Sequence, residues 1–413
     1  MSYSIRDISL APLGKKRIDW VRSYMPVLAE LGERFRREKP FAGLRVSICV
    51  HLEAKTAYLC LLLREGGAEV AVTGSNPLST KDDICAALAE EGMSVYAWFG
   101  ATPEEYHEHI RRTLEFKPHV MIDDGGEFVT MIHEEHPEYG ECLIGGCEET
   151  TTGILKLKAR VRSGSLRFPM LAVNDANSKH LFDNRHGTGQ SSWDAIMYTT
   201  NNMVTGKTVV VAGYGFCGSG IAMRAKGLGA NVIVTEVNPF RALEAAMDGF
   251  RVMKMDDAAP LGDIFVTATG CCGVITERHF NKMKDGVILA NSGHFDVEVS
   301  RADLERIAVE KINRKPFIDG YVMADGRVLN LMAEGRLVNI TAGNGHPAEI
   351  MDMSFAIQAL SAEYLVKHGR DLAPGLYDVP EDIDREVSMI KLRAMGLGLD
   401  ELTPEQEAYL SAE

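Results

Sequence analysis

Three glycines, Gly213, Gly215 and Gly218, have the spacing G-x-G-x-x-G in the segment KTVVVAGYGFCGSGIAMRAKGLGANVIVTE (207–236). In nucleotide-binding folds the first glycine makes a tight turn, the second lets the backbone approach a pyrophosphate, and the third lets helix pack on strand. Glu236 follows Gly213 by 23 residues, where a carboxylate binds a ribose 2′,3′-diol and repels a 2′-phosphate. The segment therefore predicts bound NAD, and a plain turn of a parallel sheet is the alternative.

Titratable side chains also stand at the ends of apolar runs in the first part of the chain. His51 follows the run LRVSICV (44–50), and Asp123–Asp124 closes the run HVMIDDG (119–125). The carboxyl ends of parallel strands meet at one edge of a sheet and form its ligand crevice. We therefore expect these side chains to face one site, although two adjacent aspartates are also compatible with a simple turn.

The elements that must position these residues alternate along the chain. Strands alternating with helices predict an α/β fold with doubly wound parallel sheets. A helix is expected over 348–360, and helical spacing continues in the polar stretch 371–413. Only the Asn-, Asp- and Gly-rich segment 174–189 has the composition of a break between domains. Outside 207–236, the expected strands are 44–50, 68–74, 94–100, 119–125, 170–175, 262–270 and 285–296, and the expected early helices are 53–67 and 81–92.

The overall composition is that of a globular enzyme with two or three domains. The chain has 413 residues, of which 46% are hydrophobic and 25% are charged. A net charge of −14 without a basic run argues against a nucleic-acid partner. No apolar signal core and no long apolar run is found, which predicts no membrane span and a cytoplasmic location. Eight cysteines without a CxxC pair predict neither a disulfide framework nor a metal site.

Six stretches of the sequence form a pattern: GCEETTTG (146–153), NDANSKHLFDN (174–184), VVVAGYG (209–215), VTATGC (266–271), NSGHFDVE (291–298) and AEGRLVN with GNGHP (333–347). In order and spacing, over nearly the whole chain, they resemble the segments of S-adenosyl-L-homocysteine hydrolases. The resemblance implies a substrate domain (1–180) interrupted by an inserted Rossmann NAD-binding domain (190–344), then a return segment (345–390) and a short helical C-terminal tail (391–413). A homotetramer is also implied.

The implied reaction is reversible, NAD-dependent hydrolysis of S-adenosyl-L-homocysteine or S-inosyl-L-homocysteine to nucleoside and L-homocysteine, a step of the S-adenosylmethionine cycle. The C5′–S bond is unactivated, so the ribose 3′-hydroxyl is first oxidised to a ketone, which makes the C4′ hydrogen acidic. A base then removes that proton, homocysteine leaves by β-elimination, water adds, and the hydride returns to C3′. The cofactor supplies the redox step, and the protein supplies orientation and proton transfer.

Five residues match the family's catalytic groups. Lys179 matches the lysine beside the ribose hydroxyls and is the expected base for 3′-oxidation, a role that needs a pKa lowered by desolvation or a cation. Asp183 matches the carboxylate that binds the 2′,3′-diol. His51 and Asp124 match a pair near C4′ and C5′ that protonates the thiolate and activates water. His294 matches a histidine near C3′, although a satisfied loop histidine is the alternative.

Other matches concern the substrate and the cofactor. The threonines of 150–152 match residues that reach NAD across the cleft, and the alternative is a helix N-cap. Besides Lys179 and Asp183, the expected substrate contacts are Glu53, Lys55, Glu149 and His346. The expected cofactor contacts are Thr150, Thr151, Thr152, Asn184, Gly213, Gly215, Phe216, Cys217, Gly218, Glu236, Arg241, Ser292, Gly293, His294, Asn339 and His346.

The sequence departs from the family at the purine. Where the family has H-x-T-x-E or H-x-T-x-Q, this chain has His51-Leu52-Glu53-Ala54-Lys55. Lysine only donates hydrogen bonds and ionised glutamate only accepts them, which fits the 6-keto and N1–H edge of hypoxanthine and favours S-inosyl-L-homocysteine. Two alternatives stay open. In one, Glu53 accepts from the amino group of adenine while Lys55 donates to N1; in the other, the two residues form an ion pair that ignores the base.

Smaller departures lie elsewhere. Thr188 replaces a cysteine near the nicotinamide, and Arg241 replaces an asparagine near the cofactor ribose. The chain ends at EAYLSAE, without the lysine- and tyrosine-containing tail that relatives extend into a neighbouring cofactor site, so we expect fewer contacts between subunits. Two other functions remain as alternatives: a net NAD-dependent dehydrogenase of a hydroxy or amino acid, and a non-catalytic nucleoside-binding regulator.

Overall fold

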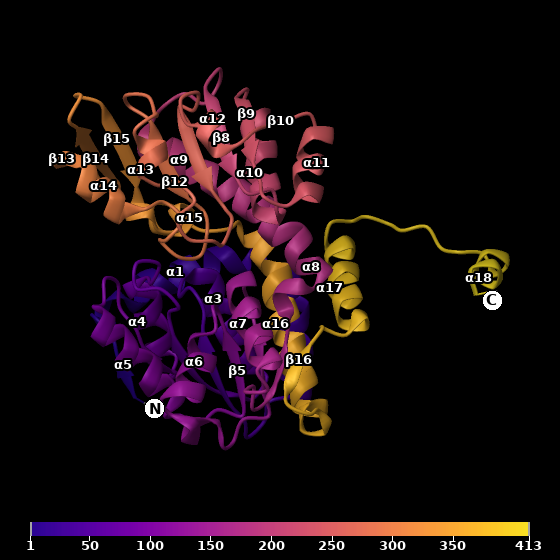
Figure 1. Cartoon of the computed structure of the whole chain (residues 1–413). Coiled ribbons are helices and arrows are strands. Elements are labelled where there is room, and N and C mark those ends of the chain that lie inside the picture. The colour runs from indigo at the N-terminus through magenta and orange to yellow at the C-terminus, as the bar shows by residue number, and fades with distance from the viewer. Residues whose placement is uncertain (1, 412–413) are drawn as a thin grey trace.

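The computed structural model describes residues 2–411, in which two eight-stranded sheets, each flanked by helices, lie one above the other (Figure 1). The first sheet has the order β1-β4-β3-β2-β5-β6-β7-β16, and all its strand pairs are parallel. Its central strands are apolar runs because helices cover both faces. Its strands are β1 (Tyr3–Ser4), β2 (Arg45–Cys49), β3 (Glu69–Thr73), β4 (Ser94–Tyr96), β5 (Val120–Asp123), β6 (Gly145–Glu148), β7 (Pro169–Leu171) and β16 (Gly375–Tyr377).

The second sheet has the order β10-β9-β8-β11-β12-β15-β14-β13. Its first six strands pair in parallel, and β14 and β13 add an antiparallel extension at one edge that the sequence analysis did not anticipate. Together the two sheets confirm the predicted α/β class with parallel sheets. The strands are β8 (Thr208–Ala212), β9 (Asn231–Thr235), β10 (Arg251–Val252), β11 (Ile264–Thr267), β12 (Ile288–Asn291), β13 (Ala308–Lys315), β14 (Ile318–Met323) and β15 (Val328–Met332).

Helices connect the parallel strands. Those of the first sheet are α1 (Ala11–Arg22), α2 (Pro26–Glu38), α3 (Ala54–Glu65), α4 (Asp82–Glu90), α5 (Pro103–Leu114), α6 (Glu127–Glu134) and α7 (Thr151–Arg162). Those of the second are α9 (Thr188–Thr200), α10 (Phe216–Gly227), α11 (Pro239–Met247), α12 (Met255–Ala258), α13 (Glu277–Phe280), α14 (Arg301–Ile307) and α15 (Val338–Thr341).

The segment expected as a break between domains, 174–189, is helical rather than irregular. It contains the short helix α8 (Asn177–Lys179), the π-helix η4 (His180–Gly187) and the start of α9. The polar side chains have partners inside and outside the segment: Asn184 contacts Lys179 and Asn174, and Asp183 contacts His346. The segment lies between β7 of the first sheet and β8 of the second, and its Asn-, Asp- and Gly-rich composition is compatible with these short helices.

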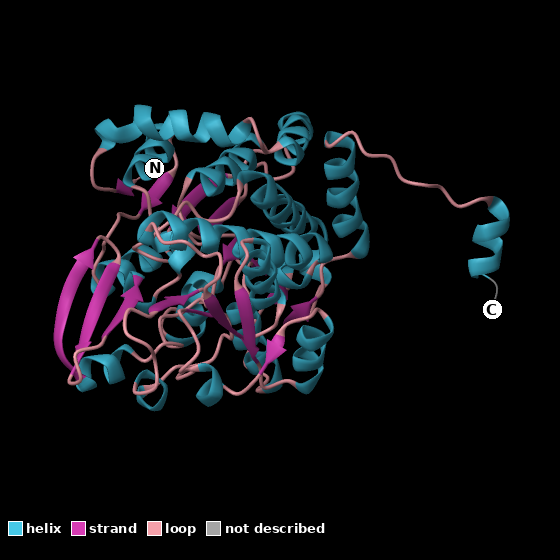
Figure 2. Ribbon diagram, turned by 90° about the horizontal axis from the view of Figure 1, so that it is seen from above, coloured by secondary structure: helices cyan, strands magenta, loops and turns pink. Residues whose placement is uncertain are grey.

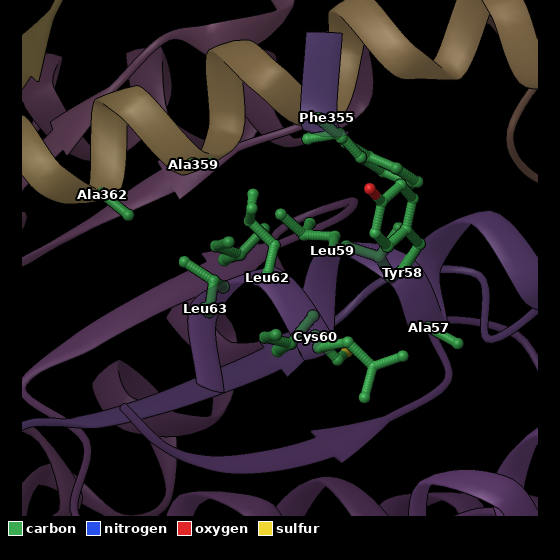
Figure 3. Close-up of a cluster of buried hydrophobic side chains, with 14 of the residues drawn as sticks. Ala57, Tyr58, Leu59, Cys60, Leu62, Leu63, Phe355, Ala359 and Ala362 are labelled. Atoms are coloured by element: carbon green, nitrogen blue, oxygen red, sulfur yellow. The ribbon is translucent and has the colours of Figure 1, made fainter. Parts of the chain in front are cut away.

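The helix α16 (Ala348–His368) returns the chain to the first sheet and is longer than the predicted 348–360. Figure 3 shows it lying over α3, with Phe355, Ala359 and Ala362 facing the side chains of Leu59 and Leu62. Every one of these side chains is buried, so α16 forms part of the first hydrophobic core. The helix α3, from the first part of the chain, and α16, from its last part, therefore pack against each other.

After β16, the helix α17 (Glu381–Ala394) packs on α2 and α16. An exposed stretch then leads to α18 (Pro404–Ser411), which stands away from the rest of the chain in both views (Figures 1 and 2). Residues predicted as strand at 97–100 and 172–175 lie outside β4 and β7. Within residues 2–411, no helix has the length and apolar character needed to cross a membrane.

Candidate active site between the two sheets

A cavity of about 1100 Å³ lies between the carboxyl-terminal ends of the two sheets. Its wall includes residues that follow β2, β5 and β6 in the first sheet and β8, β11 and β12 in the second. Open parallel sheets bind ligands at this edge, so both sheets present their binding side to the same space. Residues of η4, α15 and the start of α16 close the cavity at the passage between the sheets.

The glycine motif has the geometry that its sequence predicts. Gly213 has a φ of +95°, which a side chain would strain. A Cβ on Gly218 would lie 1.9 Å from the carbonyl oxygen of Gly213, whereas a Cβ on Gly215 would meet nothing within 4 Å. The first and third glycines are therefore required by the fold, and the second leaves open space at the N-terminus of α10, where a pyrophosphate binds.

Two further groups in this region fit NAD. Glu236 lies at the end of β9, and its carboxylate accepts hydrogen bonds from the backbone of Tyr214 at 2.7 Å and of Asn238 at 2.9 Å. These bonds fix the carboxylate beside the glycine turn, where the ribose diol is expected. Asn339 is almost fully buried, and its side-chain oxygen has no hydrogen-bond partner in the described residues. This oxygen suits the amide donor of a nicotinamide.

Most of the predicted cofactor residues line this cavity. Gly213, Gly218, Glu236 and Arg241 do not; they lie at the glycine turn and beyond it. Thr150 is the N-cap of α7 and accepts from the backbone of Gly153 at 3.3 Å, so the helix N-cap alternative is confirmed for this threonine, and its contact with NAD stays a prediction. The lining cofactor residues are Thr150, Thr151, Thr152, Asn184, Gly215, Phe216, Cys217, Ser292, Gly293, His294, Asn339 and His346.

Two arginine side chains lie near the ring of Phe216, the first residue of α10. The guanidinium of Arg241 lies 5.5 Å from the ring centre of Phe216, and that of Arg185 lies 5.3 Å from the same ring. Arg185 was not among the predicted residues. Two guanidinium groups at the N-terminus of the dinucleotide-binding helix add positive charge where phosphates are expected.

The first cluster of polar and charged side chains is formed around Lys179. Its Nζ lies 3.2 Å from Oε1 of Glu149, 3.2 Å from Oδ2 of Asp183 and 3.0 Å from Oδ1 of Asn184. Lys179 ends α8, Asp183 and Asn184 lie in η4, and Glu149 follows β6. Two separate motifs, GCEETTTG (146–153) and NDANSKHLFDN (174–184), therefore meet at one buried ammonium group.

The charges of this cluster differ from what a lysine base requires. Burial opposes the charge on Lys179, but Asp183 and Glu149 outweigh it and raise its pKa above the ordinary value. Burial also opposes ionisation of Asp183, yet Lys179 and His346 lower its pKa. Burial raises the pKa of Glu149 to about 7, against the attraction of Lys179. At neutral pH the group that titrates is therefore Glu149, while Lys179 keeps its proton.

The second cluster contains His51, Asp124 and His294. Nε2 of His51 lies 3.6 Å from Oδ2 of Asp124, and Nδ1 of His294 lies 3.9 Å from Oδ1. The first two residues follow strands of the first sheet and His294 follows β12 of the second, so the cluster spans the cleft. Their donor atoms all lie within 4.8 Å of one another, a spacing that a metal ion could also bridge. The prediction of no metal stays untested.

Two serines orient this cluster. The hydroxyl of Ser75 donates to Oδ2 of Asp124 at 2.7 Å, and Ser79 lies 2.7 Å from Nδ1 of His51. Burial raises the pKa of Asp124, but the two histidines and Ser75 outweigh it and lower that pKa overall. Burial lowers the pKa of His51 more than Asp124 raises it. The cluster therefore combines an ionised carboxylate with a neutral imidazole, which can accept a proton.

At the predicted purine position, Glu53 and Lys55 form an ion pair. Nζ of Lys55 lies 2.8 Å from Oε2 of Glu53 and donates to the carbonyl oxygen of Asn344 at 3.2 Å. The two residues face each other because Glu53 is the N-cap of α3 and has an extended backbone. The ion pair, the second of the two alternatives left open by the sequence, is thus present as a contact. Both side chains still line the cavity, so they remain available to a base.

The sequence analysis missed the contribution of α16. Ser354 donates to Oδ2 of Asp183 at 2.6 Å, and Gln358 donates to Oε2 of Glu149 at 2.6 Å. Both side chains are fully buried, four residues apart on one face of a helix whose other face enters the core. A polar pair at this spacing inside an apolar helix was the signal that could have revealed them.

Comparisons with known proteins agree with this geometry. The family model described as S-adenosyl-L-homocysteine hydrolase matches residues 2–144, and that described as its NAD binding domain matches residues 184–345. An S-inosyl-L-homocysteine hydrolase of Methanopyrus kandleri is 56% identical over 99% of this chain and 97% of its own. An adenosylhomocysteinase of Pyrococcus abyssi is 55% identical over the same shares. An adenosylhomocysteinase of Aquifex aeolicus is 52% identical over 100% of this chain and 99% of its own.

Proposed function

Because the chain belongs to the S-adenosyl-L-homocysteine hydrolase family, we propose that it hydrolyses a nucleosidyl-homocysteine thioether to nucleoside and L-homocysteine, reversibly and with bound NAD. The observation that supports this most directly is the meeting of two clusters in one cavity. The Lys179 cluster can hold ribose hydroxyls, and the His51 cluster, on the wall of the same cavity, can move protons. Both stand beside the nucleotide-binding helix.

The chemistry that NAD supplies when bound is reversible acceptance of a hydride from C3′ of the ribose. The residues that would hold it are those at the glycine turn, with Glu236 on a ribose and Asn339 at the nicotinamide. The buried Asn339 oxygen and the open face of Gly215 support this assignment.

In the proposed mechanism the Lys179 cluster binds the 2′,3′-diol and takes up the hydroxyl proton. Asp183 accepts hydrogen bonds from the diol, and Lys179 donates to the oxygen that becomes the ketone. Since Lys179 is held protonated, we assign the uptake of the proton to the pair of Lys179 with Glu149, whose carboxyl group titrates near neutral pH. This revises the sequence-based assignment of Lys179 as a base acting alone.

The second cluster then handles the protons at C4′ and C5′. Neutral His51 accepts a proton, and ionised Asp124 stabilises the imidazolium that results. The same pair protonates the departing thiolate and, in the next step, orients the water that adds. His294 reaches this point from the second sheet, so the site is complete only when both sheets face the ligand.

For the purine we propose that hypoxanthine is preferred. Lys55 would donate to the 6-keto oxygen and Glu53 would accept from N1–H, replacing their mutual ion pair with charge-assisted bonds. The names of the relatives include both the inosyl and the adenosyl thioether, so they favour neither purine.

The division of the chain also remains a proposal. Sheet membership supports a substrate domain at 1–180 with its return segment at 345–390, an NAD domain at 190–344, and a tail at 391–413. The homotetramer and the cytoplasmic location predicted from the sequence are likewise proposals.

The test is to strip the purified enzyme of its nicotinamide cofactor and assay thioether cleavage. We expect activity to vanish and to return with added NAD, while NADH does not accumulate during turnover. Cleavage at full rate without the cofactor would refute the mechanism. Net release of NADH would support the dehydrogenase alternative, and nucleoside binding without turnover would support the regulator.

A further inference from the structure

The helix that ends in Lys179 has no cap of its own. The backbone at its N-cap, Ala176, has φ −65° and ψ 143°, the extended conformation typical of this position. Alanine has no side-chain oxygen, so it cannot accept a hydrogen bond from the first free N–H groups of the helix. Leaving such groups unpaired in a buried place costs about 1 to 3 kcal/mol each.

A carboxylate from the other end of the chain takes this role. Asp384 in α17 accepts from the backbone N–H of Asn177 at 2.7 Å and of Ser178 at 2.8 Å. The hydroxyl of Ser178 also donates to this carboxylate and, at 3.0 Å, to the backbone oxygen of Asp384. One side chain therefore satisfies the first turn of α8 from more than 200 residues away.

The helix α17, which carries Asp384, is held by hydrophobic packing and by an ion pair. Val387 and Ile390, on the same helix, are buried in the first core. Lys391 contacts the buried carboxylate of Asp352 in α16 at 3.0 Å, and Asp352 in turn caps the start of α2. Packing and the ion pair of Lys391 with Asp352 therefore fix the position of Asp384. The hydrogen bonds that Asp384 accepts in turn fix the start of α8.

We propose that Asp384 is a positioning residue for Lys179. By capping the turn that Lys179 closes, it sets the direction in which the ammonium group enters the cavity. Lys179 must meet Glu149 and Asp183 at about hydrogen-bond distance at once, so a small displacement of α8 breaks the cluster. This inference rests on the proposed function, because it concerns the oxidation of the ribose 3′-hydroxyl.

The experiment measures enzyme-bound NADH at 340 nm after adenosine or inosine is added to the NAD-loaded enzyme. In Asp384→Ala we expect the rate of NADH formation to fall about 100-fold, as when a reacting group is displaced by about 1 Å. Asp384→Asn keeps one acceptor oxygen and should lose less. Retained NAD, measured after gel filtration, should stay unchanged in both variants, since Asp384 lies outside the cofactor pocket.

A second change separates positioning from general destabilisation. Adding Ala176→Ser to Asp384→Ala supplies a local cap to the N–H of Ser178, and it should restore at least a tenth of the wild-type rate. The control is Asp382→Ala, which removes an exposed carboxylate from the same helix. Asp384→Ala with wild-type NADH formation, or a rate that the added serine does not improve in folded protein, would overturn the proposal. Wild-type enzyme that forms no bound NADH would instead refute the proposed function.

Discussion

Nδ1 of His346 lies 2.8 Å from Oδ1 of Asp183, and this contact joins the loop that leaves the second sheet to the π-helix beside Lys179. The other oxygen of Asp183 is held by Lys179 and by Ser354. Three segments therefore fix one carboxylate, and it cannot turn away from the cavity without breaking a contact in each. This rigidity suits a group that must hold a ribose diol in a single orientation.

The first prediction concerns pH. Glu149 has a pKa of about 7 because it is buried, so the rate of bound NADH formation should rise about tenfold per pH unit below 7 and level off above it. Glu149→Gln should lower the rate and remove this rise. Stopped-flow absorbance at 340 nm across pH 5.5 to about 9 measures both. If the rate of the Glu149→Gln variant still rose with pH in the same way as that of the wild type, another group would accept the proton.

The second prediction separates the two clusters. His294→Asn leaves the Lys179 cluster intact, so bound NADH should form within about tenfold of the wild-type rate. Release of homocysteine, followed with a thiol reagent, should slow by about 10² to 10⁴ because proton transfer at C4′ and C5′ is impaired. His107→Asn, which alters an exposed histidine paired with Glu135, is the control. Equal losses in both half-reactions would contradict the division of roles.

The third prediction concerns the purine. The ratio of kcat/KM for S-inosyl- over S-adenosyl-L-homocysteine should exceed one in the wild type, and Lys55→Gln should lower it by about tenfold or more. The amide can present an acceptor and a donor to adenine, which a lysine cannot. Lys81→Gln, at another lysine on the cavity wall, is the matched control. A strong adenosyl preference that survives Lys55→Gln would end the proposal.

The fourth prediction concerns the glycine motif. Gly218→Ala would place a methyl group 1.9 Å from the carbonyl oxygen of Gly213, so helix and strand must separate. We expect NAD retention after gel filtration to fall by at least about tenfold and the melting temperature to drop. Gly227→Ala, at the other end of α10, meets nothing within 4 Å and should bind NAD as the wild type does. If both variants retained NAD equally, close packing at Gly218 would not matter.

The sequence pointed to the residues that face the cavity better than to the residues that support them. The glycine turn, Lys179, Asp183 and the strand ends at His51 and Asp124 were found because each stands in a local pattern, a motif or the end of an apolar run. Ser354, Gln358 and Asp384 belong to no motif and to no strand end, although the polar pair Ser354 and Gln358 stands out in the otherwise apolar helix α16. They act on residues 171 to 209 positions away, and only the folded chain brings them together.

The protonation states of the site residues also could not be predicted from the sequence alone. The expected lysine base requires a lowered pKa, but two carboxylates raise that of Lys179. Burial and ion pairing act in opposite directions, and their balance depends on distances of about 3 Å that no spacing in the sequence reveals. The same holds for Glu53 and Lys55, whose ion pair depends on the extended backbone at the start of α3.

The late return of α16 and β16 to the first sheet has a consequence for protein synthesis. When residue 345 has just left the ribosome, seven strands of that sheet exist, but the edge of β7 lacks its neighbour β16 and the leucines of α3 lack their cover. The nascent chain must therefore wait, with apolar surface uncovered, while the remaining stretch is translated. Fragments that stop at about residue 345 should accordingly be targets for chaperones and proteases, even though they contain every strand of the second sheet.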